Sequence, residues 1–120
     1  MNRAIKMLQD ELNVEINEFT VAGIRYDSLF AHKWFLGTND DLDPEIAREK
    51  IDGYLKILND DYRIERIAAI KDVRVEIYPV NAFYDYMKKH GKEGGATKFP
   101  RVLKIKQLGQ WEEFLSNYKN

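Results

Sequence analysis

The spacing between apolar residues changes several times along this sequence. Apolar residues recur every three or four positions in the first twelve residues, as on one face of a helix. They recur at every second position in 14–21 and 73–78, as in strands, and the aromatic-rich segment 30–37 ends at Gly37 like a strand. A chain that switches between these spacings is expected to pack helices on a sheet.

The first strand-like segment contains an irregularity. Its apolar residues move from even to odd positions near Asn17 and Glu18, which predicts a β-bulge or a strand with apolar residues on both faces. The segment 23–29 is long for a tight hairpin, so a loop is expected before the strand at 30–37. A short edge strand is expected at 102–105.

Two helices have recognisable start signals. Asp43 can cap a helix that begins at Pro44, and Asn81 can cap a helix that ends before Gly91. A break is expected after the first of these helices, at Asn59-Asp60-Asp61. Helical spacing also occurs in three shorter segments, 5–12, 62–70 and 111–118. The sequence therefore predicts one α+β domain, with a small mixed sheet of three to four strands covered by helices.

Length and composition exclude several classes of protein. The chain has 120 residues, enough for one domain that buries its core without disulfides. It has no cysteine, which excludes disulfides and thiolate metal sites and suits a reducing compartment, so a cytoplasmic location is expected. With 32% charged residues, no segment approaches the roughly 20 apolar residues of a membrane span, and no membrane partner is expected.

The motifs of self-contained enzymes are absent from the sequence. The two histidines, His32 and His90, are far apart and do not have the spacing of metal ligands. Asp40, Asp41 and Asp43 resemble part of a calcium loop, but the glycine at position six and the glutamate at position twelve are missing. We therefore interpret these aspartates as a turn and a helix cap, and expect no metal site.

The segment 91–101 is the main candidate for a functional loop. Three glycines and a proline in eleven residues predict irregular backbone, and Lys92, Lys98 and Arg101 supply positive charge. Over 88–106, seven lysines and arginines stand against a single glutamate, which gives a net charge of +6. A cationic, glycine-rich tract suits phosphate, either in a nucleotide or in nucleic acid.

Five short motifs stand in a fixed order along the chain. An aromatic helix is followed by Gly91-Lys92-Glu93-Gly94-Gly95 and then by Lys98-Phe99-Pro100-Arg101. The upstream motifs are Glu18-Phe19-Thr20, His32-Lys33-Trp34 and Asn59-Asp60-Asp61-Tyr62. The ordered set covers nearly the whole chain, and it resembles the C-terminal domain of bacterial members of the auxin-responsive promoter (Gretchen Hagen) family of acyl acid–amido synthetases.

This resemblance implies that residues 1–120 form the small C-terminal α+β lid domain of such an enzyme. Members of the family belong to the adenylate-forming superfamily. They use ATP and Mg²⁺ to convert a carboxylic acid into an acyl-adenylate, and then transfer the acyl group to an amine. The N-terminal domain that binds ATP and the acyl acid would be the partner and is absent from this chain. The lid alone would be inert and would bind no cofactor.

Related adenylating enzymes carry a mobile lysine on a loop of the small domain. This lysine stabilises charge on the α-phosphate while pyrophosphate leaves, and the resemblance assigns that catalytic role to Lys98. Pro100 would stiffen the loop, and Arg101 could anchor it or contact phosphate. The loop residues expected to face the cleft are Lys92, Gly94, Gly95, Pro100 and Arg101.

The residues themselves leave two other interpretations open. The chain could be a free-standing module that binds phosphate or nucleic acid through the basic loop 91–106, with Trp34, Phe35 and Tyr78 as stacking rings. Aromatic residues on strands usually belong to the core, however, and the formal net charge of the chain is −1, so no nucleic-acid partner is expected. The chain could also be a purely structural interaction domain.

Overall fold

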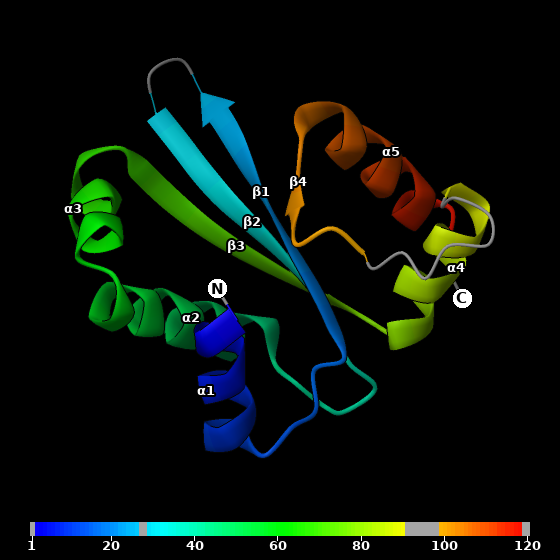
Figure 1. Cartoon of the computed structure of the whole chain (residues 1–120), viewed down its shortest axis with the longest axis horizontal. Coiled ribbons are helices and arrows are strands. Elements are labelled where there is room, and N and C mark those ends of the chain that lie inside the picture. Colours follow the sequence, from blue (N-terminus) through cyan, green and yellow to red (C-terminus); the bar gives the residue numbers. More distant parts are fainter. Residues whose placement is uncertain (1, 27–28, 91–98, 119–120) are drawn as a thin grey trace.

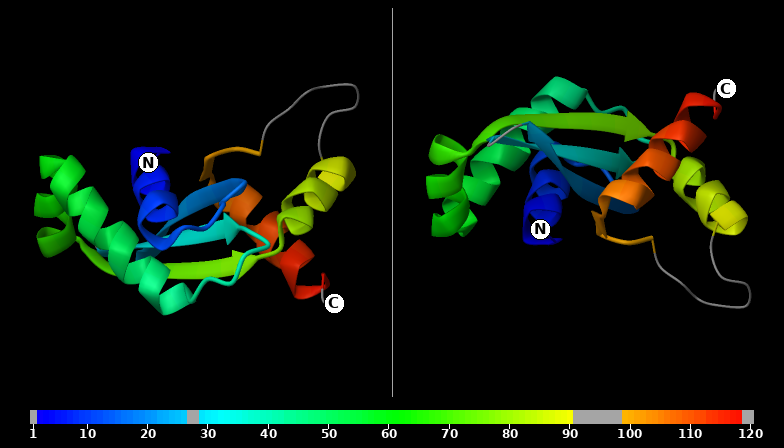
Figure 2. Two further views of the ribbon diagram at one scale, coloured as in Figure 1. Left: turned by 90° about the horizontal axis from the view of Figure 1, so that it is seen from below. Right: turned by 90° about the horizontal axis from the view of Figure 1, so that it is seen from above.

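The part of the chain that the structure describes, residues 2–26, 29–90 and 99–118, forms five helices around a four-stranded sheet in this computed structural model. In chain order the elements are α1 (Asn2–Leu12), β1 (Glu18–Tyr26), β2 (Leu29–Gly37), α2 (Pro44–Leu58), α3 (Asp60–Ala68), β3 (Ile70–Tyr78), α4 (Val80–His90), β4 (Val102–Leu103) and α5 (Ile105–Ser116). Figure 1 shows α1, α2 and α3 on one side of the strands and α4 and α5 on the other, and Figure 2 shows the same two groups from below and above.

The sheet is mixed and has the strand order β3-β2-β1-β4. The central strands β1 and β2 run antiparallel, while β3 is parallel to β2 and β4 is parallel to β1. The predicted α+β architecture with a small mixed sheet is therefore confirmed. The predicted edge strand is confirmed over Val102 and Leu103, whereas Ile105 already belongs to α5.

Strand β1 corrects two of the sequence-based expectations. It pairs with β2 in one continuous register from Glu18 to Tyr26, so the loop expected at 23–29 is wrong over its first four residues. The β-bulge expected near Asn17 is also wrong, because the change in parity marks the start of the strand. Glycine is common in loops, so Gly23 favours a loop in this segment. The backbone hydrogen bonds to β2 keep it extended, because nearly every residue type can make such bonds.

The alternative expectation, a strand apolar on both faces, is confirmed. Phe19 and Val21 are buried on one face of β1, and Ala22 is buried on the other. In β2 the neighbours Trp34 and Phe35 likewise point to opposite faces, and both are almost completely inaccessible to solvent. Each face of the sheet therefore has its own core, one under α1, α2 and α3 and the other under α4 and α5.

The start of α2 was predicted from local sequence and is confirmed. The carboxylate of Asp43 accepts a hydrogen bond from the N–H of Glu45 at 2.8 Å, and Pro44 is the first residue of the helix. The expected break at Asn59 is also present. The Asn59 side chain accepts a hydrogen bond from the N–H of Tyr62 at 3.0 Å and so begins α3.

The cap expected from Asn81 is wrong. Helix α4 begins one residue earlier, at Val80, whose N–H donates to Oδ1 of Asn39 at 3.2 Å. Asn39 follows β2 and is 41 residues away in the chain, so no local pattern could indicate this contact. Among the helices of the described residues, none combines the length and apolar character needed to cross a bilayer.

Gly37 provides a test of how closely α4 packs on the sheet. A Cβ atom added at Gly37 would lie 2.7 Å from Cε1 of Phe83, a fully buried ring of α4. We expect Gly37→Ala to lower the free energy of unfolding by about 1–3 kcal/mol, measured by urea denaturation, because the ring has to move.

Gly109 in α5 is the matched control for this substitution. Nothing lies within 4 Å of a Cβ added there, so Gly109→Ala should raise the free energy of unfolding by up to about 1 kcal/mol through helix propensity. A Gly37→Ala protein as stable as the wild type would contradict the close packing of α4 on β2.

Candidate functional site

The structure describes the two flanks of the predicted functional loop. Helix α4 ends at His90, and the described chain resumes at Phe99. Four of the residues predicted for the site lie outside the described residues, namely Lys92, Gly94, Gly95 and Lys98. Pro100 and Arg101 lie within them, and the contacts of this following segment define the base of the loop.

Aromatic packing holds both flanks in the core under α4 and α5. The ring of Tyr86 lies 4.4 Å from that of His90 and 5.6 Å from that of Phe99, measured between centroids. Phe99 is only 3% exposed and also packs on Phe83 and Trp111, at 4.9 and 4.8 Å. The residues on either side of 91–98 are therefore attached to the same rigid cluster.

Arg101 anchors the segment that follows the loop to strand β1. Its Nη1 donates to Oε1 of Glu18 and to the backbone oxygen of Phe19, both at 2.9 Å. Its guanidinium also lies 4.3 Å from the centroid of the Phe19 ring. The N–H of Val21 donates to the backbone oxygen of Arg101 at 2.9 Å, so both side chain and backbone fix this position. The structure thus shows an anchoring contact, and the phosphate contact stays a prediction.

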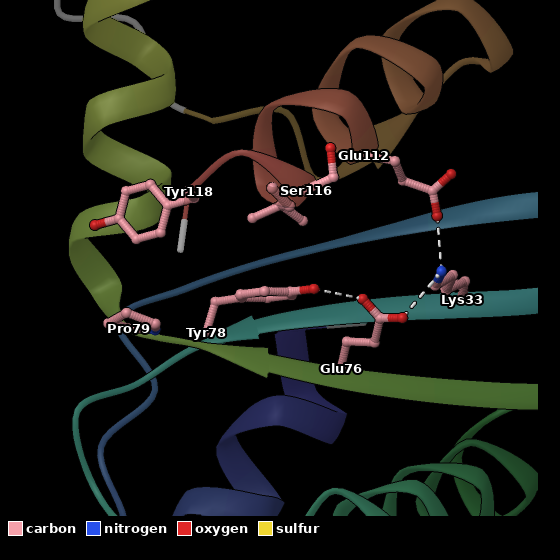
Figure 3. A pocket seen from close by; sticks show the side chains of 8 residues that line it. Lys33, Glu76, Tyr78, Pro79, Glu112, Ser116 and Tyr118 are labelled. Atoms are coloured by element: carbon pink, nitrogen blue, oxygen red, sulfur yellow. Dashed lines mark hydrogen bonds and ion pairs between the residues drawn. The ribbon is translucent and has the colours of Figure 1, made fainter. Parts of the chain in front are cut away.

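A pocket of about 640 Å³ opens between β3 and α5 (Figure 3). At its edge the ammonium of Lys33 lies 2.7 Å from Oε2 of Glu112 and 3.1 Å from Oε2 of Glu76. The hydroxyl of Tyr78 donates to the other oxygen of Glu76 at 2.8 Å. Lys33 therefore joins β2 to both β3 and α5.

The charges in this pocket are set by burial and by pairing. Burial alone would lower the pKa of Lys33, but the hydrogen bonds to Glu112 and Glu76 outweigh it and raise that pKa. Burial and the hydrogen bond to Glu76 also raise the pKa of Tyr78. At neutral pH both groups keep their protons, so Lys33 acts here as a fixed cation and not as a base or nucleophile.

Sequence reasoning did not identify the Lys33 pocket. A weak signal was present, because Lys33 stands two residues before the buried Phe35 and therefore on the same face of β2. A cation on a covered face of a sheet requires an anionic partner. The identity of that partner, Glu112, depends on a contact between residues 79 positions apart.

The contacts of the residues concerned bear on two other sequence hypotheses. The carboxylate of Asp43 caps α2, and Oδ2 of Asp40 accepts a hydrogen bond from the N–H of Glu15 at 2.7 Å. These contacts agree with the turn-and-cap interpretation of the aspartates. Trp34 and Phe35 are at most 1% exposed, so they cannot stack on nucleic-acid bases in this fold.

Comparisons with known proteins agree with the motifs. The sequence pattern of the GH3 family C-terminal domain matches residues 1–107. Among solved structures, a GH3.15 acyl acid amido synthetase is similar with a TM-score of 0.70 and 15% identity, covering 95% of this chain and 23% of that one. The AtGH3.15 acyl acid amido synthetase in complex with 2,4-DB has a TM-score of 0.63 and 16% identity, covering 92% and 22%.

At this level of identity the two structures show a shared fold. The chain spans less than a quarter of their length. No curated protein matches it by sequence.

Lys33 supports a prediction about stability. In Lys33→Met, Glu76 and Glu112 lose their cation, and we expect the free energy of unfolding to fall by about 1–2 kcal/mol. A fully buried pair would cost more, but the two glutamates are about 40% exposed. Lys6→Met is the control, because the Lys6–Asp10 pair is exposed and 3.7 Å apart.

The pH dependence of this effect has a definite sign. Because folding raises the pKa of Lys33 above its usual 10.5, its contribution is complete below that value and is lost as pH rises through the folded-state value. The difference between wild type and Lys33→Met should stay constant from about pH 6 to 9 and shrink in more alkaline solution. Equal effects of Lys33→Met and Lys6→Met would contradict this account.

Proposed function

Because the GH3 C-terminal domain pattern matches most of its length, the chain belongs to the GH3 family, and we propose that it is the mobile lid of an acyl acid–amido synthetase. A separate adenylation domain would bind ATP, Mg²⁺ and the acyl acid, and the lid would close over it. The complete enzyme would form an acyl-adenylate and then transfer the acyl group to an amine. The cysteine-free sequence suits a cytoplasmic enzyme.

The fixed base of the loop is the observation that carries this proposal. A lysine that acts only when two domains close must arrive at the same position in the cleft each time they close. Lys98 directly precedes Phe99, which is locked among Phe83, Tyr86 and Trp111. The Arg101–Glu18 contact fixes the chain just beyond it. A single cation tied to such a base can stabilise negative charge that develops on a phosphate.

Under this proposal the chain's own contribution to nucleotide chemistry is positive charge. In residues 2–26, 29–90 and 99–118, no three His, Cys, Asp or Glu side chains lie close enough together to hold a metal ion. As the resemblance implies, we assign Mg²⁺ to ligands of the adenylation domain and of the nucleotide. Lys98 would neutralise charge on the α-phosphate, with Lys92 as a second cation, and Pro100 and Arg101 would support the loop.

The proposal predicts a selective effect of Lys98→Ala on the first half-reaction. In the intact synthetase this substitution should slow acid-dependent ATP–pyrophosphate exchange by about 100-fold or more, as expected when one preorganised donor to a developing anion is lost. The thermal midpoint should stay within about one degree of the wild type, because the sequence predicts that Lys98 belongs to an irregular loop, where substitutions usually change stability little.

Lys106→Ala is the matched control, since Lys106 belongs to the same cationic tract but lies exposed on α5. It should leave the exchange rate unchanged, and the 120-residue chain alone should show no exchange. A Lys98→Ala synthetase with wild-type exchange would remove Lys98 from this role. Tight and steeply salt-dependent binding of an oligonucleotide to the isolated chain would instead favour a nucleic-acid module.

A further inference from the structure

A second pocket lies on the sheet face that α2 and α3 cover, away from α4 and α5. Its volume is about 310 Å³. Apolar side chains form most of its wall, and its mouth is formed by exposed residues of β1, β4 and the α2–α3 junction. The lining residues are Val21, Gly23, His32, Trp34, Leu55, Asn59, Tyr62 and Val102.

Two of the sequence motifs meet at this pocket. His32 and Trp34 come from His32-Lys33-Trp34, and Asn59 and Tyr62 come from Asn59-Asp60-Asp61-Tyr62. Nothing in the proposed role of the 91–98 loop uses these four side chains. His32 and Asn59, which are 27 positions apart in the sequence, thus line the same pocket.

His32 offers this pocket an unused hydrogen-bonding group. No described residue forms a hydrogen bond with the imidazole, whose ring lies 6.0 Å from that of Tyr62. Burial, followed by the nearby Arg66 guanidinium, lowers the pKa of His32 below its usual 6.5, although Asp52 partly offsets this. At neutral pH the ring is therefore uncharged, with one nitrogen that donates and one that accepts.

Asn59 adds a further donor at the pocket, and the Trp34 indole lies in the pocket wall. The indole N–H of Trp34 is buried and has no acceptor among the described residues. The Oδ1 atom of Asn59 is used by the N–H of Tyr62, which leaves the amide NH₂ of Asn59 without a partner in the described residues. Because the Trp34 N–H is inaccessible to solvent, the polar groups open to a ligand are those of His32 and Asn59.

The charged groups behind the pocket are already paired with one another. The Tyr62 hydroxyl donates to Oδ1 of Asp52 at 2.6 Å, and Nε of Arg66 donates to the same oxygen at 3.1 Å. The ammonium of Lys56 lies 3.3 Å from the other oxygen of Asp52. This network holds the Tyr62 ring in place, and both of its cations, Lys56 and Arg66, are engaged by the carboxylate of Asp52.

From these features we propose that the pocket binds a small, uncharged aromatic molecule that carries one hydrogen-bonding group. Apolar walls with a few unused polar groups and a rigid frame are the usual composition of such sites. An anionic ligand would lose its hydration here without gaining a free cation. This site is on the other face of the sheet from Tyr86 and Phe99, which pack beside the two ends of 91–98, so the proposal goes beyond the function proposed above.

Benzamide and benzoate form a matched pair of probes, since they have the same shape and differ in charge. We would titrate each into the isotope-labelled 120-residue chain and follow the two indole N–H signals and the His32 ring by NMR. Benzamide should shift the Trp34 and His32 signals saturably, and benzoate should bind at least about tenfold more weakly. The Trp111 indole is an internal control, because it is also buried without an acceptor but lies in the other core.

Filling the mouth of the pocket should abolish this binding. Nothing lies within 4 Å of a Cβ added at Gly23, so Gly23→Leu should fold and weaken benzamide binding by about tenfold or more. Gly109→Leu on α5, in equally open space, should not. Val102→Trp is a second occluding variant at the exposed mouth. Absent or non-saturable shifts, equal binding of benzoate, equal movement of Trp111, or full binding by both occluding variants would each overturn the proposal.

Discussion

The packing of Trp111 is the interaction on which the second half of the molecule depends. Its ring is completely buried, and its centroid lies 5.9 Å from that of Phe35, 4.9 Å from Phe83, 5.1 Å from Tyr86 and 4.8 Å from Phe99. These rings belong to β2, to α4 and to the segment after the loop. One side chain of α5 therefore joins the sheet to both flanks of 91–98, so the loop base is as rigid as the core.

Strand β2 directs its side chains to both faces of the sheet. Phe35 and Lys33 point toward α5, where they support the loop base and the ionic contact with Glu112. Trp34 and His32 point the other way and line the pocket beside α3. Because side chains alternate along a strand, neighbouring residues of β2 contribute to two separate regions of the molecule.

Sequence patterns predicted the features that depend on contacts between residues close in the sequence. They did not predict the features that depend on contacts between residues far apart in it. The helix starts after Asp43 and Asn59 depend on contacts two or three residues away, so patterns could indicate them. The ion pairs of Lys33 with Glu112 and of Arg101 with Glu18 join residues about 80 positions apart. The motifs identified Glu18 and Arg101 separately, but only the fold shows that they are bound to each other.

We propose that Lys98, the lysine after the glycines, serves acyl-adenylate formation and not acyl transfer. Single-turnover kinetics on the intact synthetase separate the two steps when preformed acyl-adenylate is supplied together with the amine. The account predicts that Lys98→Ala transfers the acyl group from this intermediate at a rate close to that of the wild type, while it forms the intermediate from ATP slowly. Loss of the transfer step with normal adenylate formation would contradict it.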